Sequence, residues 1–213
     1  MEKDVGILMA DLSGYTAMTD VHGGATPATL VTKYIVLVNI SICGNCEVTQ
    51  RIGDQIVVIS EKATDLAATI EKLKRSIIEE SHFLSIHAGL HFGPIHREGD
   101  SLFGSTINVT SRIMNLAQRG QVLCSSSFVN AIGESAFLFS PVGRFKFKNV
   151  LKDVEIFELG VIANSSVPVD PVCHMHISTE SRFTLEWAGK TYHFCSEQCK
   201  NIFKGDPLAF GRE

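Results

Sequence analysis

Two acidic residues early in the chain have the sequence context of metal ligands. Asp11 ends the apolar run 7–11 and precedes a Ser-Gly turn, so its carboxylate is expected at the end of a strand. Asp54 follows Gly53 in the segment 52–56, where Gly53 fits the first central position of a type II′ turn. Carboxylates on neighbouring strands can hold two Mg²⁺ or Mn²⁺ ions, which together stabilise the attacking and leaving oxygens of a phosphoryl transfer. The pair therefore predicts nucleotide chemistry.

Three cysteines near the end of the chain have the spacing of a second, softer metal site. Apolar residues alternate before and after an Ala-Gly-Lys turn, which predicts a hairpin that ends at Cys195. Ser196 is suited to cap a helix, and that helix would place Cys195 and Cys199 one turn apart. Together with Cys173 they offer three thiolates, which favour Zn²⁺, Cu⁺ or another soft metal. A unit this small usually needs such a crosslink, and three buried thiols without a metal are the alternative.

The composition argues against several classes of function. The chain has 213 residues, of which 45% are hydrophobic, enough for one medium domain and one small one. A net charge of −4 with scattered Lys and Arg residues gives no support to a nucleic-acid partner. The most hydrophobic helical stretch, 30–42, contains Lys33 and is shorter than the ~20 residues of a membrane span, so no membrane partner is expected. Residues 1–4 do not begin a secretory signal, and we expect a cytoplasmic protein whose cysteines remain thiols or metal ligands.

The hydrophobic pattern predicts an α+β fold with hairpins rather than a doubly wound parallel sheet. Helices are expected at 13–20, 26–45, 62–80 and 105–118, with a short one ending near 131. Strands are expected at 4–11, 47–52, 55–60, 84–92, 121–125, 143–148 and 153–159, with a ribbon at 94–103. Small and polar residues followed by Pro predict a linker, which divides the chain into a first domain, 1–160, a linker, 161–169, and a second domain, 170–213.

Five motifs of the first domain resemble those of one enzyme family. The segment 11–16, Asp-Leu-Ser-Gly-Tyr-Thr, resembles the opening Asp-Ile-x-Gly-Phe-Thr motif of the class III adenylate/guanylate cyclase catalytic domain, and 52–54 resembles its second metal turn. The segments 87–94, 103–112 and 147–158 resemble its central strand, its Gly-x-x-Val-Asn-x-x-x-Arg helix and its closing hairpin. The resemblance implies a class III nucleotidyl cyclase fold, which contains a ferredoxin-like palm.

The resemblance also implies roles for particular residues. Asp11 and Asp54 would hold two Mg²⁺ or Mn²⁺ ions, Asn108 would position the ribose, and Arg112 would stabilise charge that develops on the α-phosphate. The products would be a cyclic nucleotide and pyrophosphate, made from ATP or GTP for intracellular signalling. In this family the carboxylates and the Asn/Arg helix come from different protomers, which implies a head-to-tail homodimer.

Two departures from the family pattern bear on the substrate. Gln50 stands where adenylate cyclases typically have a Lys that reads the purine, and Ser101 stands at a second purine-reading position. Both side chains can donate and accept hydrogen bonds, so neither distinguishes adenine from guanine. We expect cyclic AMP, rather than cyclic GMP, as the product. Asn115 and Arg119 lie on the same predicted helix face as the site residues and are expected to be surface residues.

The second domain resembles a different family. The segments 170–175 and 187–200, followed by Phe203, resemble the YHS domain of the TRASH-like metal-binding class, which implies a hairpin-helix unit. The family's usual Gly after the first Cys is His174 here. A nitrogen ligand for the metal could come from three nearby histidines, among which the sequence does not choose: His174, His176 and His193.

The sequence also suggests roles for the other histidines and leaves an alternative function open. The first domain's histidines, including His22, are interpreted as structural, and His87 and His91 as partly buried strand residues. The competing function is a catalytically weak or inactive cyclase-fold homodimer that senses nucleotide or metal. A diguanylate cyclase is disfavoured because no Gly-Gly-Asp/Glu-Glu-Phe stretch is present.

Overall fold

The computed structural model describes residues 2–99, 101–134, 137–160, 167–178 and 181–210. The predicted linker, 161–169, lies largely outside these residues. Among the helices of the described chain, none combines the length and the hydrophobicity needed to cross a bilayer.

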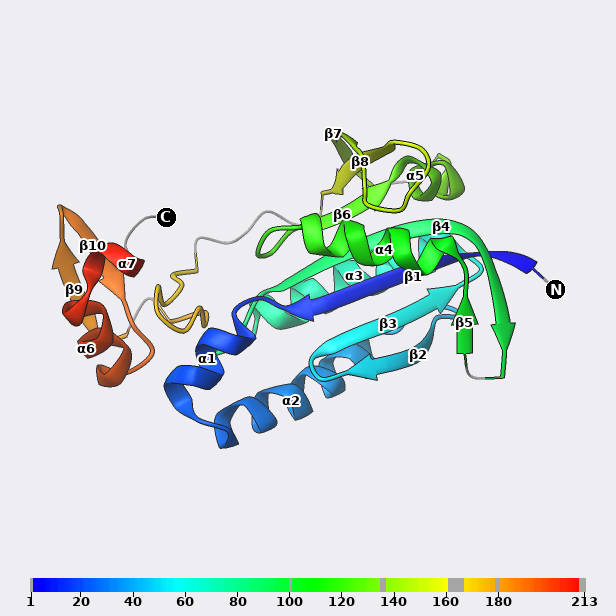
Figure 1. The fold of residues 1–213 in the computed structure, drawn as a ribbon. Helices are drawn as coiled ribbons and strands as arrows, with labels where there is room; N and C mark the ends of the chain where they lie inside the picture. Colours follow the sequence, from blue (N-terminus) through cyan, green and yellow to red (C-terminus); the bar gives the residue numbers. More distant parts are fainter. Residues whose placement is uncertain (1, 100, 135–136, 161–166, 179–180, 211–213) are drawn as a thin grey trace.

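Eight strands form one mixed sheet in the order β2-β3-β1-β4-β6-β8-β7, with β5 paired to β4 (Figure 1). Their bounds are β1 (Glu2–Leu12), β2 (Glu47–Ile52), β3 (Gln55–Ser60), β4 (Ile86–Glu98), β5 (Ser101–Phe103), β6 (Val122–Ser125), β7 (Phe139–Phe145) and β8 (Val154–Leu159). The β4–β6 pair is parallel and the other pairs are antiparallel. This topology confirms the predicted α+β class.

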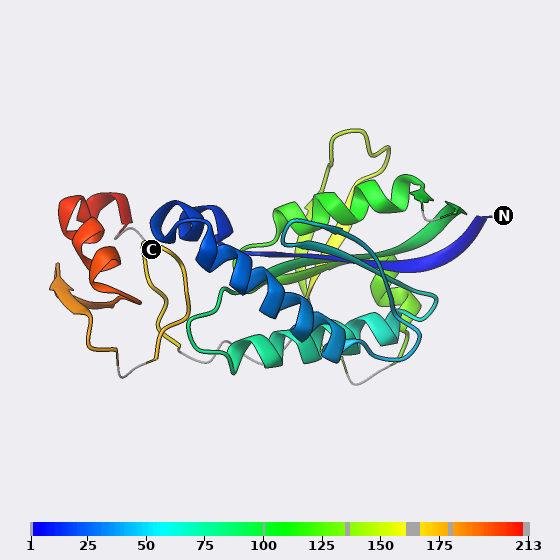
Figure 2. The same cartoon turned by 90° about the horizontal axis from the view of Figure 1, so that it is seen from below.

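Helices cover both faces of the sheet. Their bounds are α1 (Tyr15–His22), α2 (Ala25–Ser41), α3 (Ala63–Ile78), α4 (Ser105–Leu116) and α5 (Ser126–Ile132). Figure 2 shows α2 and α3 on one face and α4 on the other. The alternation of β1 explains this arrangement, because Leu8 and Ala10 join the core under α2 and α3, whereas Ile7 and Met9 pack with Met114 of α4. The central strand is therefore apolar on both faces.

Three predicted boundaries were wrong for local reasons. The helix expected to reach 45 ends at Ser41, because the backbone already leaves the helical conformation at Ile42, whose ψ is 128°, and then turns at Gly44, whose φ is 54°. The strand expected at 143–148 is β7, Phe139–Phe145, and an irregularity between Pro141 and Gly143 hides it in the sequence pattern. The helix expected at 13–20 runs from Tyr15 to His22.

The C-terminal unit is a hairpin and two helices. Its elements are β9 (Thr184–Trp187), β10 (Lys190–His193), α6 (Glu197–Gly205) and α7 (Pro207–Phe210). Four aromatic side chains pack with ring centroids 4.7 to 6.1 Å apart, namely Trp187, Tyr192, Phe194 and Phe203. The predicted hairpin is confirmed, and so is the predicted cap, because the Ser196 side chain accepts a hydrogen bond from the backbone N–H of Cys199 at 3.2 Å.

The C-terminal unit docks on the first domain through its own backbone. The N–H of His176 donates to the carbonyl of Phe83 at 2.7 Å, and the N–H of His82 donates back to the carbonyl of His176 at 3.1 Å. Met175 and Leu84 form a bridge between these hydrogen bonds, and both side chains belong to the main core cluster. The two units therefore share one continuous apolar core.

The contact between β4 and α4 depends on Gly89. A Cβ placed at Gly89 would lie 2.3 Å from the backbone nitrogen of Met114 and 2.7 Å from the carbonyl oxygen of Thr110. Because both are backbone atoms of α4, no side-chain rotation can relieve the clash. Gly89 thus sets the distance at which α4 crosses the sheet.

We expect Gly89→Ala to lower the free energy of unfolding by about 3 kcal/mol, because the added methyl group pushes α4 away from β4. Urea denaturation followed by circular dichroism measures the change. Gly24→Ala is the matched control, since a Cβ at Gly24 meets no atom within 4 Å. A Gly89→Ala protein as stable as the Gly24→Ala control would contradict this account of the helix contact.

Candidate active site and metal centre

The two aspartates lie at neighbouring strand ends. Asp11 is the penultimate residue of β1 and pairs with His87 of β4. Asp54 lies in the two-residue turn between β2 and β3, and Gly53 before it has the positive φ, 64°, that the first position of such a turn requires. Because β3 pairs directly with β1, the turn brings Asp54 to the end of β1.

Burial and mutual proximity together perturb the two aspartates. Burial raises the pKa of Asp11 to about 7, and the hydrogen bond and the negative charge of Asp54 add to the increase. Asp11 Oδ1 is buried and accepts no hydrogen bond from the described residues. The hydroxyl group of Tyr34, completely buried on α2, is also without a hydrogen-bond partner there, and burial and then the charges of Asp11 and Asp54 raise its pKa. The raised pKa and the unpartnered oxygen of Asp11, next to Asp54, are the properties of a cation site.

Asn108 and Arg112 lie one turn apart on the exposed face of α4. The opposite face of the helix is buried through Val109 and Ile113. The helix start is fixed by Thr106, whose hydroxyl group donates to the carbonyl of Pro94 at 2.7 Å. The two polar side chains therefore project from a helix that is held firmly to the sheet.

The two candidate purine-reading residues are on different strands. Gln50 is exposed on the edge strand β2, and Ser101 is exposed at the start of β5, opposite Glu98 of β4.

Three thiols and one imidazole converge at the C-terminal end of α1, where His22 lies. The sulfur of Cys195 lies 3.4 Å from that of Cys173 and 3.5 Å from that of Cys199. Nε2 of His22 lies 3.4 Å from the sulfur of Cys195 and 3.7 Å from that of Cys199. All four donor atoms lie within 4.8 Å of one another. The three cysteines are free thiols, so this group has the donor set of a soft-metal site.

Asp170 holds the two cysteine-bearing loops together. Its Oδ1 accepts hydrogen bonds from the backbone N–H groups of Val172 at 2.8 Å and Cys173 at 3.3 Å. Its Oδ2 accepts from the N–H of Cys195 at 2.8 Å. The carboxylate is completely buried, and these bonds fix the distance between Cys173 and Cys195.

The thiols of the cysteine group differ in pKa. The hydrogen bond from Cys173, followed by that from Cys199, lowers the pKa of Cys195, whereas the hydrogen bond to Cys195 raises the pKa of Cys173. Cys195 is thus the thiol that ionises first.

The histidines require two corrections to the sequence interpretation. The member of the four-donor group is His22, which was interpreted as structural, and none of the three nearby candidates belongs to that group. His174 has a positive φ of 64°, the conformation that a Gly at this position adopts easily, and its ring contacts Arg119. Nε2 of His176 forms a 2.6 Å hydrogen bond with Ser85, and His193 lies on β10. His87 and His91 are partly buried, as predicted.

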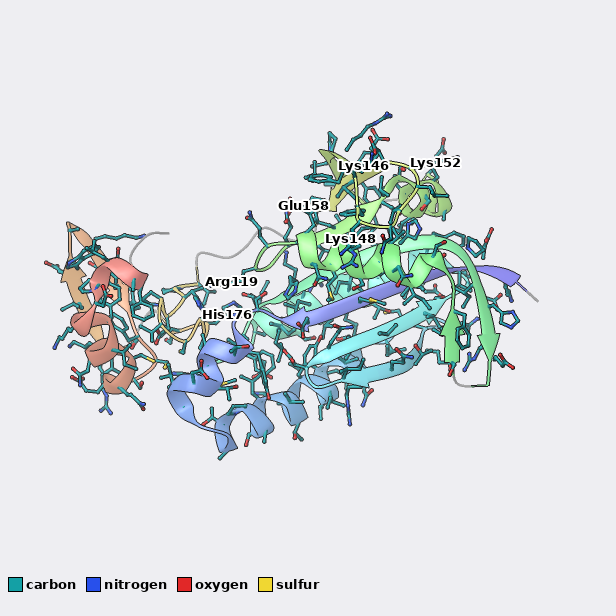
Figure 3. All side chains as sticks on the ribbon, in the orientation of Figure 1. Arg119, Lys146, Lys148, Lys152, Glu158 and His176 are labelled. Carbon is teal, nitrogen blue, oxygen red and sulfur yellow. The ribbon has the colours of Figure 1, made fainter. Side chains whose placement is uncertain are left out.

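Arg119 was expected on the surface, and this expectation was wrong. It follows α4 in the loop before β6 and is partly buried against the C-terminal unit. Figure 3 shows Arg119 near His176, where the two units meet. Arg119 therefore contributes to the contact between the units.

Comparison with known proteins identifies both parts. The family model of the adenylate and guanylate cyclase catalytic domain matches residues 1–159, and that of the YHS domain, a metal-binding domain, matches residues 169–211. A pH-sensitive adenylate cyclase of Mycobacterium tuberculosis is 26% identical over 162 residues, which are 74% of this chain and 41% of that protein. An adenylate cyclase of Glutamicibacter nicotianae is 22% identical over 162 residues, 76% of this chain and 40% of that protein. The chain thus spans about 40% of the length of these two relatives.

Solved structures show the same fold. An adenylate cyclase from Trypanosoma brucei, described in its monomeric state, has a TM-score of 0.68 at 16% identity, over 82% of this chain and 93% of that chain. The guanylate cyclase domain from Catenaria anguillulae, in complex with GTP, has a TM-score of 0.64 at 15% identity, over 76% of this chain and 98% of that chain. The fold is that of a class III cyclase catalytic domain. The chain belongs to the adenylate and guanylate cyclase catalytic-domain family, with a YHS domain at its C-terminal end, as the sequence motifs predicted.

We expect Asp170→Asn to destabilise the cysteine loops by about 2 kcal/mol, because an amide has one acceptor oxygen and leaves a buried N–H group without a partner. Urea denaturation measures the loss. Asp206→Asn is the control, since Asp206 is exposed and its Oδ1 accepts from the N–H of Ala209. Equal stability of the two variants would show that Asp170 does not organise the cysteine loops.

Proposed function

We propose that this chain is a nucleotidyl cyclase that converts a nucleoside triphosphate into a cyclic nucleotide and pyrophosphate for intracellular signalling. ATP is the proposed substrate in preference to GTP. The observation that carries the proposal is the adjacent pair of carboxylates, Asp11 and Asp54, in a cyclase fold that also presents Asn108 and Arg112. A domain that had lost catalysis would have no need to keep two repelling carboxylates together at a cost in stability.

Asp11 and Asp54 would hold Mg²⁺ or Mn²⁺. The fit is supported by the unpartnered buried oxygen of Asp11 and by its raised pKa, since both reflect negative charge that a cation neutralises. Carboxylate oxygens are the hard ligands that these ions prefer. When bound, two such ions lower the pKa of a substrate hydroxyl group and stabilise the charge of a leaving pyrophosphate.

Residues of α4 would act on the substrate. The 3′-oxygen of the nucleotide forms a bond to the α-phosphorus as the bond to the β-phosphate oxygen breaks, and negative charge grows on the α-phosphate. Arg112 would donate N–H groups to that phosphate, and Asn108 would hold the ribose in position. Three lysines in the segment between β7 and β8 would add positive charge: Lys146, Lys148 and Lys152 (Figure 3). The end of β7 and the segment that follows it pack against α4 through Phe145 and Phe147.

The complete site would form in a head-to-tail homodimer, with the carboxylates of one protomer facing Asn108 and Arg112 of its partner. Exposed apolar side chains on two edge elements support such an interface. Ile52 of β2 is 68% exposed and Phe103 of β5 is 52% exposed, and a partner protomer would cover both side chains. Both lie on strands that also carry the candidate purine-reading residues.

The preference for ATP rests on the adenylate cyclases among the relatives, since Gln50 and Ser101 can each donate and accept hydrogen bonds and so do not select a base.

We further propose that residues 1–160 form the catalytic domain and that 161–169 link it to the YHS domain at 170–213. Within the YHS domain, Cys173, Cys195 and Cys199 would bind Zn²⁺, Cu⁺ or another soft metal. Free thiols and nucleoside triphosphates coexist in the cytoplasm, the location that we propose.

Purified protein incubated with ATP or GTP and Mn²⁺ should yield the cyclic product, resolved by chromatography. We expect Asp11→Asn, Asp54→Asn and Arg112→Ala each to lower the rate roughly 10²-fold or more, because each removes a group that stabilises the transition state. Asn115→Ala is the matched control, an exposed residue of the same helix. Absence of product from the wild-type protein with either nucleotide would favour the alternative, a cyclase-fold sensor.

Mixing two inactive variants tests the shared site. Random exchange between Asp54→Asn and Arg112→Ala protomers should restore about a quarter of the wild-type rate, because half of the dimers then contain one intact site of two. Subunit exchange is monitored separately with differently tagged protomers. If tagged heterodimers form and remain inactive, the two halves of the site do not come from different protomers.

A further inference from the structure

We propose that His22 of the cyclase domain is the fourth ligand of the cysteine site, so that one metal ion joins helix α1 to the YHS domain. The inference rests on the proposed metal binding by the three cysteines and adds a ligand from outside the YHS domain. It makes the soft-metal site a crosslink between the two domains.

The distances match a single tetrahedral ion. Bonds of about 2.3 Å to sulfur and 2.0 Å to nitrogen at tetrahedral angles give sulfur–sulfur separations of about 3.8 Å and sulfur–nitrogen separations of about 3.5 Å. The sulfur–sulfur distances from Cys195 are 3.4 and 3.5 Å, and the distances from His22 Nε2 to Cys195 and Cys199 are 3.4 and 3.7 Å. Three thiolates and one imidazole form a common structural Zn²⁺ donor set, so we take Zn²⁺ as the ion.

A hydrogen bond from the YHS domain holds the end of α1 that carries His22. It lies in the last turn of α1, and the carbonyl of the preceding residue, Val21, accepts a hydrogen bond from the side-chain amide of Gln198 at 2.8 Å. Gln198 precedes Cys199 on α6, so the YHS domain holds the end of α1 next to the thiols. Figures 1 and 2 both show α1 between β1 and the YHS domain.

An entry path for the ion is present. An open cleft of ≈ 500 Å³ is lined by His22 and Cys195, and by residues of α2 and of the segment before β4, including Lys33 and His82. The donor atoms of His22 and Cys195 therefore border the cleft, and Cys173 and Cys199 are buried behind them. An ion can reach the four ligands from solvent without separation of the domains.

The other end of α1 connects the crosslink to the active site. The helix begins at Tyr15, shortly after Asp11, and Gly14 between them packs against the Cβ of His174, where any added Cβ would lie only 2.6 Å away. The YHS domain thus contacts α1 at both ends, at Gly14 and at His22. An ion bound at His22 restrains the helix that follows the catalytic carboxylate.

Absorption spectroscopy with Co²⁺ in place of Zn²⁺ tests the ligand directly. The full-length wild-type protein should bind one Co²⁺ with the visible bands of a tetrahedral thiolate site. We expect His22→Ala to bind roughly tenfold to a hundredfold more weakly and with altered bands, because water replaces the imidazole. His22→Cys should restore tight binding with stronger sulfur-to-metal bands, which a merely structural histidine would not do.

His193→Ala is the matched control, a histidine that lies two residues before Cys195 and is not part of the four-donor group. Its spectrum and affinity should equal those of the wild type. A wild-type protein that binds no metal would overturn the proposed cysteine site as well, whereas normal Co²⁺ spectra and affinity in His22→Ala would overturn only the role of His22. A changed spectrum in His193→Ala with a normal one in His22→Ala would assign the fourth ligand to His193.

Amide hydrogen exchange tests the crosslink itself. Adding Zn²⁺ to the metal-free wild-type protein should slow exchange in the peptide that contains residues 15–22, because the last turn of α1 becomes a ligand-bearing turn. In His22→Ala, at Zn²⁺ concentrations that fill the cysteines, exchange in this peptide should remain at its metal-free rate. Equal slowing in both proteins would show that the ion does not restrain α1 through His22.

Discussion

The placement of two partly buried carboxylates next to each other is the constraint on which the catalytic part of this fold depends. Asp11 and Asp54 are adjacent and partly buried. Burial raises the pKa of Asp11 most, and the hydrogen bond and the negative charge of Asp54 raise it further. The rest of the sheet compensates for this instability. Five consecutive residue pairs join β1 to β3, and buried apolar residues line both faces of β1, so the strand that ends in Asp11 is firmly held.

The same rigidity extends to the elements that would meet the substrate. Gly89 lets α4 approach β4 closely enough for backbone contact, and Thr106 ties the first turn of α4 to the end of the same strand. Asn108 and Arg112 thereby project from a helix whose position is set by the sheet. Precise placement of such groups matters because electrostatic stabilisation requires donors that are already in position when charge develops.

Local sequence signals predicted the features that depend on neighbouring residues. The turn that contains Asp54 and the helix cap at Ser196 each follow from a few adjacent side chains, and the structure contains both. His22 could not be found in this way, because its partners are far along the chain and no spacing rule connects them. Arg119 was assigned to the surface for a related reason, since helical periodicity reports which face packs inward and cannot report a second domain.

The backbone bridge between Leu84 and Met175 has a consequence for biosynthesis. The segment before β4 is made early, whereas the strand-like segment that pairs with it is made only after the whole catalytic domain. Until then Leu84, which is buried in the complete fold, lacks its bridge partner Met175. Domains emerging from the ribosome generally fold as units from the N-terminal side. Here the catalytic domain would fold first, and the backbone contact between Leu84 and Met175 would form last, when the YHS domain docks.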